Sequence, residues 1–279
     1  MTTDPLHIAI LGCGPAGLFA AHAAAEAGAQ FTIFSKNRKS FMRGAQYLHR
    51  PIPGLSGEPF QVEYELWGTV EGYRDKVYGD MGDVLVSPET LVGISDAWDI
   101  REAYDAAWEL YGRHVVDVDF ATMGDRGAFY DNLSATNDLV VSTIPAPLLC
   151  QRNAEHEFRS QAVWVTEGLK RPAEFGFQDM HNGNAQRDNL VVCSGDPQDW
   201  WYRQSRIHGW ENTEFPLDHK PNFPGKVHEV IKPLDHTCTC HPDFVRAGRY
   251  GVWKKGVLSH EAFYDTARHI VALEQEFVS

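Results

Sequence analysis

The apolar positions between residues 7 and 35 predict a strand, a helix and a second strand. Residues 7–11 form a short apolar run, residues 15–28 are rich in alanine, and residues 31–35 form a second apolar run. The sequence Gly-Cys-Gly-Pro-Ala-Gly occupies residues 12–17, between the first strand and the helix. A glycine sequence flanked in this way is typical of a nucleotide-binding unit.

The pattern changes after residue 50. Partial alternation of apolar and polar residues at 60–70 and 75–81 predicts antiparallel strands. Residues 96–111 predict a helix, because their apolar side chains recur at helical spacing. A helix is also expected from Ser259, as N-cap, to about Phe277. Further strands are expected at 114–120, 137–145, 161–168 and 189–196.

The order of these elements predicts an α/β protein with two interleaved domains. A Rossmann-like domain with a parallel sheet is expected from residues 1–50, 111–150 and 245–279. A smaller mixed-β domain of the α+β type, which would cap the substrate, is expected from residues 51–110 and 151–244. We predict no internal repeat and no low-complexity segment.

Composition narrows the possible partners of the 279-residue chain. Its net charge of −13 argues against a general nucleic-acid surface, which requires clustered Lys and Arg. No stretch has the roughly 20 apolar residues of a membrane span, and the N-terminal residues lack the features of a signal peptide. Five cysteines, one of them in the glycine sequence, make a disulfide framework unexpected. A cytoplasmic protein with no membrane partner is expected.

The glycine sequence has the residue types that a dinucleotide site requires. Gly12 permits a tight turn, Gly14 lets a pyrophosphate approach the backbone, and Gly17 lets the helix pack on the strand. The helix N-terminus at Pro15 and Ala16 offers free N–H groups and the positive end of the helix dipole to phosphates. We therefore predict a bound dinucleotide, with a ligand-free glycine turn as the alternative.

The end of the second strand departs from the usual pattern. An acidic residue that binds the ribose hydroxyls is expected about 20 positions after the glycines, but Ser35 and Lys36 stand there. The Ser35 hydroxyl is able to bond a ribose. Lys36, Arg38, Lys39 and Arg43 form a basic cluster that fits either the 2′-phosphate of NADP or a solvated loop. This segment leaves FAD, NADP and the absence of a cofactor open.

Four separate segments resemble a known family of flavoproteins. They are "GPAGL" at 14–18, "NDLVVSTIPAPLL" at 137–149, "DPQDWWYRQSRIHG" at 196–209 and "GRYGVWKKGVLSHEAFYDTARHI" at 248–270. In this order they resemble the amine-oxidase and UDP-galactopyranose mutase superfamily, and the third segment resembles the mutase branch. The resemblance covers about a third of the chain.

The resemblance implies an FAD cofactor, with its ADP part on the glycine sequence and its flavin end near residues 248–261. A helix N-terminus near Ser259 would stabilise negative charge on a reduced flavin. Gly44, Gln46 and His49 loosely match the family segment that lines the flavin. The expected cofactor-binding residues are Gly12, Gly14, Pro15, Ala16, Gly17, Ser35, Lys36, Arg43, Gly44, Gln46, Gly248, Trp253, Ser259, His260 and Glu261.

The resemblance also implies where the substrate binds. Arg203 matches an arginine that grips the substrate phosphate, and Arg249 matches a second arginine near the flavin. A guanidinium fork suits an anionic group better than Lys does. Arg203, Arg249 and His49 are the expected catalytic residues, with a surface ion pair and a structural bridge as the alternatives for the two arginines.

Two features depart from the mutases. Residues 51–110 offer one clear helix in place of the helical domain that holds uridine, so a UDP-sugar substrate is not favoured. Gly195-Asp196 could instead be the ribityl-binding pair of other flavoproteins, although the aromatic residues after it do not resemble a flavin-facing helix.

The expected function is an FAD-dependent oxidoreductase that abstracts a hydride from a small or nucleotide-linked substrate. A redox-neutral flavin mutase or lyase is the first alternative. An NADP-binding protein or a noncatalytic nucleotide sensor is the second. The sequence leaves the oligomeric state open.

One further segment, "DHTCTCHPD", places His236, Cys238 and Cys240 at alternate positions, on one face if the segment is a strand. Sulfur and imidazole are ligands that zinc prefers, but C-x-C spacing is less typical of zinc sites than C-x₂₋₄-C. We interpret these as structural residues and assign no metal, with a metal site and redox-active thiols as alternatives.

Overall fold

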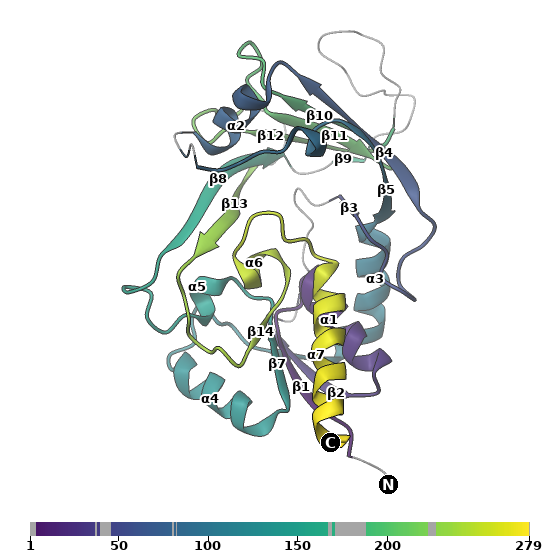
Figure 1. Cartoon of the computed structure of the whole chain (residues 1–279), viewed down its shortest axis with the longest axis vertical. Coiled ribbons are helices and arrows are strands. Elements are labelled where there is room, and N and C mark those ends of the chain that lie inside the picture. The colour runs from purple at the N-terminus through teal and green to yellow at the C-terminus, as the bar shows by residue number, and fades with distance from the viewer. Residues whose placement is uncertain are drawn as a thin grey trace.

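The computed structural model describes residues 4–36, 38–39, 46–79, 81, 83–166, 169–170, 188–222 and 227–278. Their strands form two sheets, which we call sheet A and sheet B, and Figure 1 shows sheet B above sheet A. Sheet A has the order β14-β7-β1-β2-β6 and all its strand pairs are parallel. Its strands are β1 (His7–Leu11), β2 (Gln30–Ser35), β6 (Val115–Asp117), β7 (Leu139–Ser142) and β14 (Val245–Arg246).

Helices cover both faces of sheet A, as in a Rossmann-like domain. On one face α1 (Pro15–Glu26) packs against α3 (Ile100–Tyr111) and α7 (Glu261–Val278), side by side in Figure 1. The other face carries α4 (Arg126–Thr136) and α5 (Ala146–Leu149). Side chains of a strand alternate between faces, so Ile8 and Ile10 enter one core while Ala9 and Leu11 enter the other.

Sheet B is mixed and has the order β13-β8-β12-β11-β10-β4-β5-β3, with β9 paired to β12. The pair β10–β4 is parallel and the other pairs are antiparallel. Its strands are β3 (Tyr47–Leu48), β4 (Phe60–Trp67), β5 (Gly93–Asp99), β8 (Phe158–Thr166), β9 (Leu169–Lys170), β10 (Leu190–Ser194), β11 (Arg203–Ile207), β12 (Trp210–Phe215) and β13 (Val227–His236).

Short elements complete the described chain. They are α2 (Val70–Tyr78), α6 (Gly248–Val252) and the 3₁₀ turns η1 (Pro88–Thr90) and η2 (Gly112–His114). Helix α2 packs on sheet B, where its Tyr73 and Val77 join a core with Val62 and Val191. Among the described residues, no helix combines the length and the apolar character that crossing a membrane requires.

Three predicted elements differ in the structure. The strand expected at 75–81 is the end of helix α2, which begins where Thr69 Oγ1 accepts a hydrogen bond from the N–H of Gly72. The helix expected at 96–111 begins only at Ile100, because β5 continues to Asp99, whose carboxylate caps the helix. The last helix begins at Glu261, just after the predicted cap.

The α/β fold with a parallel Rossmann-like sheet and a mixed second sheet is confirmed. The strands of sheet A come from residues 7–35, 115–142 and 245–246. However, β3 belongs to sheet B, and α3 packs on α1 although it was placed in the second domain. The domain boundaries therefore stay a prediction.

Candidate functional site

The glycine sequence at residues 12–17 forms a tight loop, which we call the glycine loop, between β1 and α1. Gly12 has φ of +104°, a conformation that side chains disfavour, and its N–H donates to the Phe34 carbonyl at 2.9 Å. A Cβ at Gly17 would overlap the carbonyl oxygen of Gly12. These two glycines therefore allow the close packing of the helix on the loop, as predicted for this motif.

Gly14 differs from the other two glycines. It is the N-cap of α1, with φ of −69°, and no atom lies within 4 Å of a Cβ built on it. Pro15 follows as the first helical residue. The free N–H groups of the helix N-terminus and the open space at Gly14 form a cradle suited to phosphates.

Two distant segments converge on the glycine loop. The hydroxyl of Thr143, just after β7, donates to the Leu11 carbonyl at 2.8 Å and lies 2.6 Å from a Cβ built on Gly12. Gly248, at the start of α6, has φ of +67°, and a Cβ there would lie 2.5 Å from the Cβ of Ala16. The structure thus brings the sequence-predicted residues Ala16 and Gly248 into contact.

Two of the basic residues after β2 have acidic partners. Lys36 Nζ lies 2.7 Å from a carboxylate oxygen of Asp119, and Lys39 Nζ lies 2.6 Å from Asp105. The Cys13 thiol donates to the carbonyl of Lys36 at 3.4 Å. Ser35, half-buried, ends β2 beside these groups. Two other predicted residues, Arg43 and Gly44, lie outside the described residues.

The segment before α7 contains a buried histidine. His260 is 7% exposed, and burial together with the charges of His49 and Arg50 lowers its pKa to about 4. The rings of His49 and His260 lie 6.5 Å apart. Glu261 Oε2 accepts a hydrogen bond from the N–H of Leu258 at 2.9 Å, which stabilises the start of α7.

Trp253, a predicted cofactor-binding residue, makes structural contacts with β8. It ends α6 in the left-handed region, with φ of +52°. Its indole N–H donates to the Arg159 carbonyl of β8 at 3.0 Å, and its ring packs edge-on against Phe158. Since the indole has a single donor, this bond leaves none for a ligand. Ser259 lies in the turn before α7, where its carbonyl accepts from Ala262.

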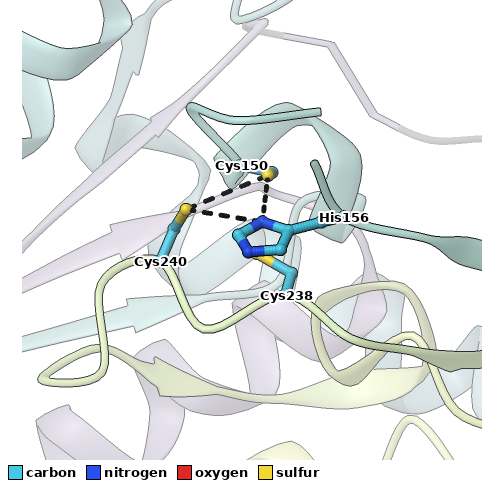
Figure 2. Close-up of side chains that lie close together, drawn as sticks. All are labelled: Cys150, His156, Cys238 and Cys240. Carbon is cyan, nitrogen blue, oxygen red and sulfur yellow. Dashed lines mark hydrogen bonds between the residues drawn. The ribbon is translucent and has the colours of Figure 1, made fainter. Parts of the chain in front are cut away.

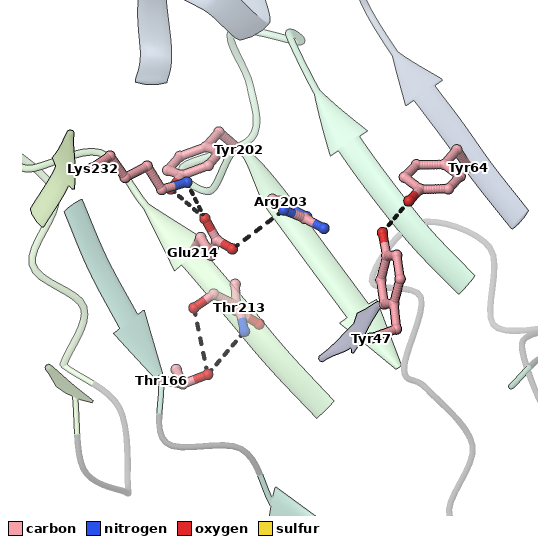
Figure 3. Close-up of polar contacts among 8 residues, drawn as sticks. All are labelled: Tyr47, Tyr64, Thr166, Tyr202, Arg203, Thr213, Glu214 and Lys232. Atoms are coloured by element: carbon pink, nitrogen blue, oxygen red, sulfur yellow. Dashed lines mark hydrogen bonds and ion pairs between the residues drawn. The ribbon is translucent and has the colours of Figure 1, made fainter. Parts of the chain in front are cut away.

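Arg203 belongs to a buried group of charges on sheet B (Figure 3). Glu214 of β12 accepts hydrogen bonds from the Tyr202 hydroxyl and from Lys232 Nζ, both at 2.5 Å, and lies 3.7 Å from Arg203. Burial raises the pKa of Glu214, but Lys232 and Arg203 outweigh it and lower the pKa to about 2. Burial lowers the pKa of Arg203, but the charge of Glu214 raises it, and the pKa is raised overall.

Arg249 lies near this group of charges. Burial and then the charge of Arg249 lower the pKa of Lys232, against the attraction of Glu214. Burial raises the pKa of Tyr78, and the charge of Arg249 opposes that increase. The two arginines predicted to bind substrate therefore act on the same set of side chains, from α6 and from sheet B.

Two tyrosines that the sequence did not single out complete this region. The hydroxyls of Tyr47 and Tyr64 are hydrogen-bonded to each other, and Figure 3 shows them facing across from β3 to β4. Burial raises the pKa of Tyr47, whereas the charge of Arg203 opposes that shift. Burial and Arg203 lower the pKa of His49. No local signal in the sequence marks this pair. The two tyrosines come close only because β3 and β4 both pair with β5 in sheet B.

Buried polar atoms without a partner recur among the predicted site residues. They are shielded from solvent, and none has a hydrogen-bond partner in the part of the chain that the structure describes. Unpaired polar atoms are costly to bury, so such atoms suit a ligand that completes their bonds. The atoms are Gln46 Oε1, Arg203 Nε, Arg249 Nε and His260 Nδ1.

A cavity of about 860 Å³ lies on sheet B beside α2. It is lined by residues that include Lys76, Asp199 and Trp200. Lys76 Nζ donates to the Asp196 carbonyl at 2.5 Å within the same region. Gly195, just after β10, therefore packs against Thr69 and Tyr73 at the start of α2.

Comparisons with known proteins show the fold. No family model and no curated protein matches the sequence. The structure of MibH, a tryptophan 5-halogenase, matches with a TM-score of 0.54 and 12% identity over 98% of this chain and 67% of MibH. The biosynthetic enzyme RebC, solved with reduced flavin, matches with a TM-score of 0.47 and 12% identity over 89% of this chain.

A third match is the tetrameric 2-methyl-3-hydroxypyridine-5-carboxylic acid oxygenase, with a TM-score of 0.49 and 10% identity over 97% of this chain and 88% of the oxygenase. The chain spans just over half of RebC, 56% of its length. These structures are a halogenase, an oxygenase and a biosynthetic enzyme, and no amine oxidase or mutase is among the three. The likeness to MibH shows that the chain has the fold of that enzyme, a Rossmann-like domain joined to a mixed sheet.

Proposed function

We propose that the chain binds FAD and is an oxidoreductase that acts on a small anionic substrate. The observation that carries the proposal is the convergence of Thr143 and Gly248 on the glycine loop. These two positions belong to the segments whose resemblance to flavoproteins first suggested FAD. Their meeting at one loop supports a single dinucleotide site.

The residues present fit such a cofactor. Gly14 offers an open approach to the N-terminus of α1, where backbone N–H groups would hold the pyrophosphate. Ser35 stands where a ribose hydroxyl would need a partner. The unpaired atoms of Gln46 and His260 are candidates to bond the flavin end. Bound FAD would supply an acceptor for the hydride that leaves the substrate.

The acidic partners of the basic cluster favour FAD over NADP. Recognition of a 2′-phosphate requires cationic side chains that are available to it. Lys36 is paired with Asp119 and Lys39 with Asp105, so two of the four basic residues have their charge offset by a carboxylate. We therefore assign the site to FAD.

The charges on sheet B favour an anionic substrate group. Glu214 carries one negative charge, whereas Arg203, Lys232 and Arg249 carry three positive charges. Arg203 and Arg249 each also retain an unpaired Nε. A guanidinium binds a carboxylate or phosphate through a planar pair of hydrogen bonds. We propose that the two arginines hold the anionic group, and that the substrate is a small or nucleotide-linked molecule.

We propose hydride abstraction from a C–H bond, such as the one next to an amine nitrogen, as the reaction, as in amine oxidases. This reaction needs little acid–base machinery in the protein. Among the described residues, the groups near Arg203 fit that requirement: Glu214 is already bonded to Lys232 and Tyr202, and His49 has a lowered pKa that favours the neutral form. The role of these side chains is to bind and orient the substrate.

The cofactor is tested on the purified whole chain. We expect a yellow protein that releases FAD, rather than FMN or NADP, on denaturation, and an apoprotein that regains one FAD per chain. Anaerobic addition of a panel of anionic amines and hydroxy acids should bleach the flavin for the true substrate class, with oxygen consumed on return to air. A colourless protein that binds NADPH and cannot take up FAD would overturn the assignment. If no compound of any class reduces the flavin, the assignment of FAD stands but the proposed oxidoreductase activity is wrong.

A further inference from the structure

Four side chains meet where the chain passes between the two sheets. Cys150 follows α5, His156 precedes β8, and Cys238 and Cys240 follow β13. Figure 2 shows the imidazole of His156 among the three sulfur atoms. Cys240 lies 84 residues from His156 and 90 from Cys150, so the fold alone brings these groups together.

The spacing of the four ligand atoms matches a single tetrahedral ion. Zinc bonds of about 2.3 Å to sulfur and about 2.0 Å to nitrogen place tetrahedral ligands about 3.8 Å apart for two sulfurs and about 3.5 Å apart for sulfur and nitrogen. Here the sulfurs of Cys150 and Cys240 are 3.9 Å apart, and His156 Nδ1 lies 3.2 Å and 3.9 Å from them. All four ligand atoms lie within 4.8 Å of one another.

The surroundings suit thiolate ligands. Cys150, Cys238 and Cys240 are buried and form no disulfide bond, and His156 is half-buried. The guanidinium of Arg246 donates to the sulfur of Cys238 at 3.4 Å, and the N–H of Arg152 donates to the sulfur of Cys150 at 3.4 Å. Three thiolates around a divalent ion leave one negative charge, which the guanidinium of Arg246 would offset.

We propose that Cys150, His156, Cys238 and Cys240 bind one structural zinc ion. Three sulfurs and one imidazole nitrogen fill all four positions of a tetrahedral site, so the protein leaves no position open for water or substrate. A single ion fits ligand atoms this close together, whereas an iron–sulfur cluster holds its thiolates around several metal atoms.

The proposed site departs from the interpretation of the run at 236–240 as structural residues without a metal. It retains Cys238 and Cys240 from the predicted set but replaces His236 with His156. His236 is bonded elsewhere: its Nδ1 accepts from the N–H of Cys238 at 2.9 Å, and its Nε2 lies 3.5 Å from Arg246. His236 therefore supports the loop that carries the ligands.

The position of the site indicates that the ion would link the two connections between the sheets. The chain leaves sheet A after β7 and enters sheet B at β8, and it returns to sheet A between β13 and β14. Cys150 and His156 lie on the outward crossing, and the two other cysteines lie on the return. Zinc would fasten the two crossings to each other and so fix sheet B relative to the nucleotide-binding sheet.

The first test measures metal in the whole chain, expressed in zinc-supplemented medium and dialysed. We expect about one zinc per chain by plasma mass spectrometry, and an X-ray absorption spectrum with three sulfur neighbours and one nitrogen neighbour. Replacement by Co²⁺ should give the intense bands of tetrahedral cobalt thiolate. Less than about 0.1 zinc per chain, even after refolding with zinc, or a Cys150–Cys240 disulfide in the fresh protein, would overturn the proposal.

The second test assigns the ligands. Cys240→Ser and His156→Ala should each lower the zinc content at least about 10-fold, whereas Cys193→Ala should keep it. Cys193 is a matched control, because it is also buried and free but lies in β10. Full zinc content in Cys240→Ser or in His156→Ala would contradict the ligand set. If a ligand variant does not fold, the absorption spectrum of the wild-type chain still decides between three-sulfur coordination and none.

Discussion

Gly14 and Gly17 lie on the same turn of the glycine loop but tolerate a side chain very differently. A Cβ at Gly17 would overlap the carbonyl of Gly12, whereas a Cβ at Gly14 would meet no protein atom within 4 Å. The role of Gly17 is thus visible in the folded chain, while the need for glycine at position 14 would come from a ligand. A substitution at Gly14 is therefore a test of binding with little effect on folding.

We predict that Gly14→Val lowers the FAD content of the purified protein at least about 10-fold, because its side chain occupies the space that a pyrophosphate needs. The free energy of unfolding of the apoprotein should change by less than about 1 kcal/mol. Flavin absorbance and urea unfolding measure the two quantities.

Gly124→Val is a matched control, since Gly124 also has open space around its Cβ position. It should keep its FAD. Full FAD occupancy in a folded Gly14→Val protein would place the dinucleotide elsewhere.

Arg249 is the residue that we expect to matter most for substrate binding. Charged hydrogen bonds contribute roughly 1.5–3 kcal/mol, so Arg249→Ala should lower kcat/KM for the substrate about 10- to 100-fold. The kcat/KM of Arg249→Lys should lie between those of the wild type and Arg249→Ala, because lysine keeps the charge but lacks the planar fork. Steady-state kinetics at equal FAD content measure the effect.

Arg268→Ala, on the exposed face of α7, should leave kcat/KM unchanged. If the Arg249 variants instead lose FAD or unfold, while their activity per bound flavin stays that of the wild type, Arg249 is a structural bridge and the proposed substrate contact is wrong.

His260 makes stability depend on pH. Its pKa of about 4 in the folded chain lies below the usual 6.5, so the unfolded chain binds the proton more tightly. The contribution of His260 is therefore complete above pH 6.5 and is lost as the pH falls toward 4. Between pH 7 and pH 5 the apoprotein should lose about 2 kcal/mol that a His260→Gln variant does not lose. Urea unfolding at both pH values tests this, and parallel curves for the two proteins would contradict it.

At the scale of elements, Glu214 connects three strands of sheet B, of which β11 and β12 are neighbours and β13 lies beyond β8. It lies on β12 and contacts Tyr202 and Arg203 at the start of β11 and Lys232 on β13. Glu214→Gln would leave two buried cations without their carboxylate, which costs about 3–5 kcal/mol of the free energy of unfolding. Chemical denaturation measures this loss.

Glu229→Gln on the exposed face of β13 is the matched control and should change stability by less than about 0.5 kcal/mol. Adding Lys232→Met to Glu214→Gln should recover part of the loss, because it removes one of the unpaired charges. A Glu214→Gln protein as stable as the wild type would mean that water or an anion replaces the carboxylate.

The elements that the sequence predicted well are those whose signals are local. The first strand, glycine loop, helix and second strand are contiguous, so length, apolar runs and glycine spacing specify them together. Helix α2 was mistaken for a strand, because a short segment such as 75–81 fits both periods. The strand β5 was missed because its sequence, GISDAWD, does not alternate: two polar residues are followed by two apolar ones.

The residues of the candidate site also divide into those that a local sequence signal marks and those that only the fold brings together. Gly248 was predicted from its segment, and the structure places it against Ala16. The Tyr47–Tyr64 pair and the bond between Glu214 and Lys232 depend on which strands are neighbours in sheet B. A single cysteine such as Cys150, six residues before a histidine, carries no pattern until β13 brings two more cysteines beside it.

At the scale of the whole molecule, the chain passes twice from sheet A to sheet B and back. Strands β1 and β2 are followed by three strands of sheet B, then by β6 and β7, then by a second set in sheet B, and finally by β14. Each sheet is therefore assembled from segments far apart in the sequence. Such long-range pairing closes large loops and slows folding.

The contact between α1 and α7 has a consequence for how the protein is made. The glycine loop and α1 are translated well before α6 and α7, which contact them. Until then the apolar face of α1, including Leu18 and Phe19, has no partner in α7 and is open to chaperones or to aggregation. A nucleotide bound as we propose would therefore load only after α6 has been translated, and the supply of cofactor from then on would influence how many chains reach the native state.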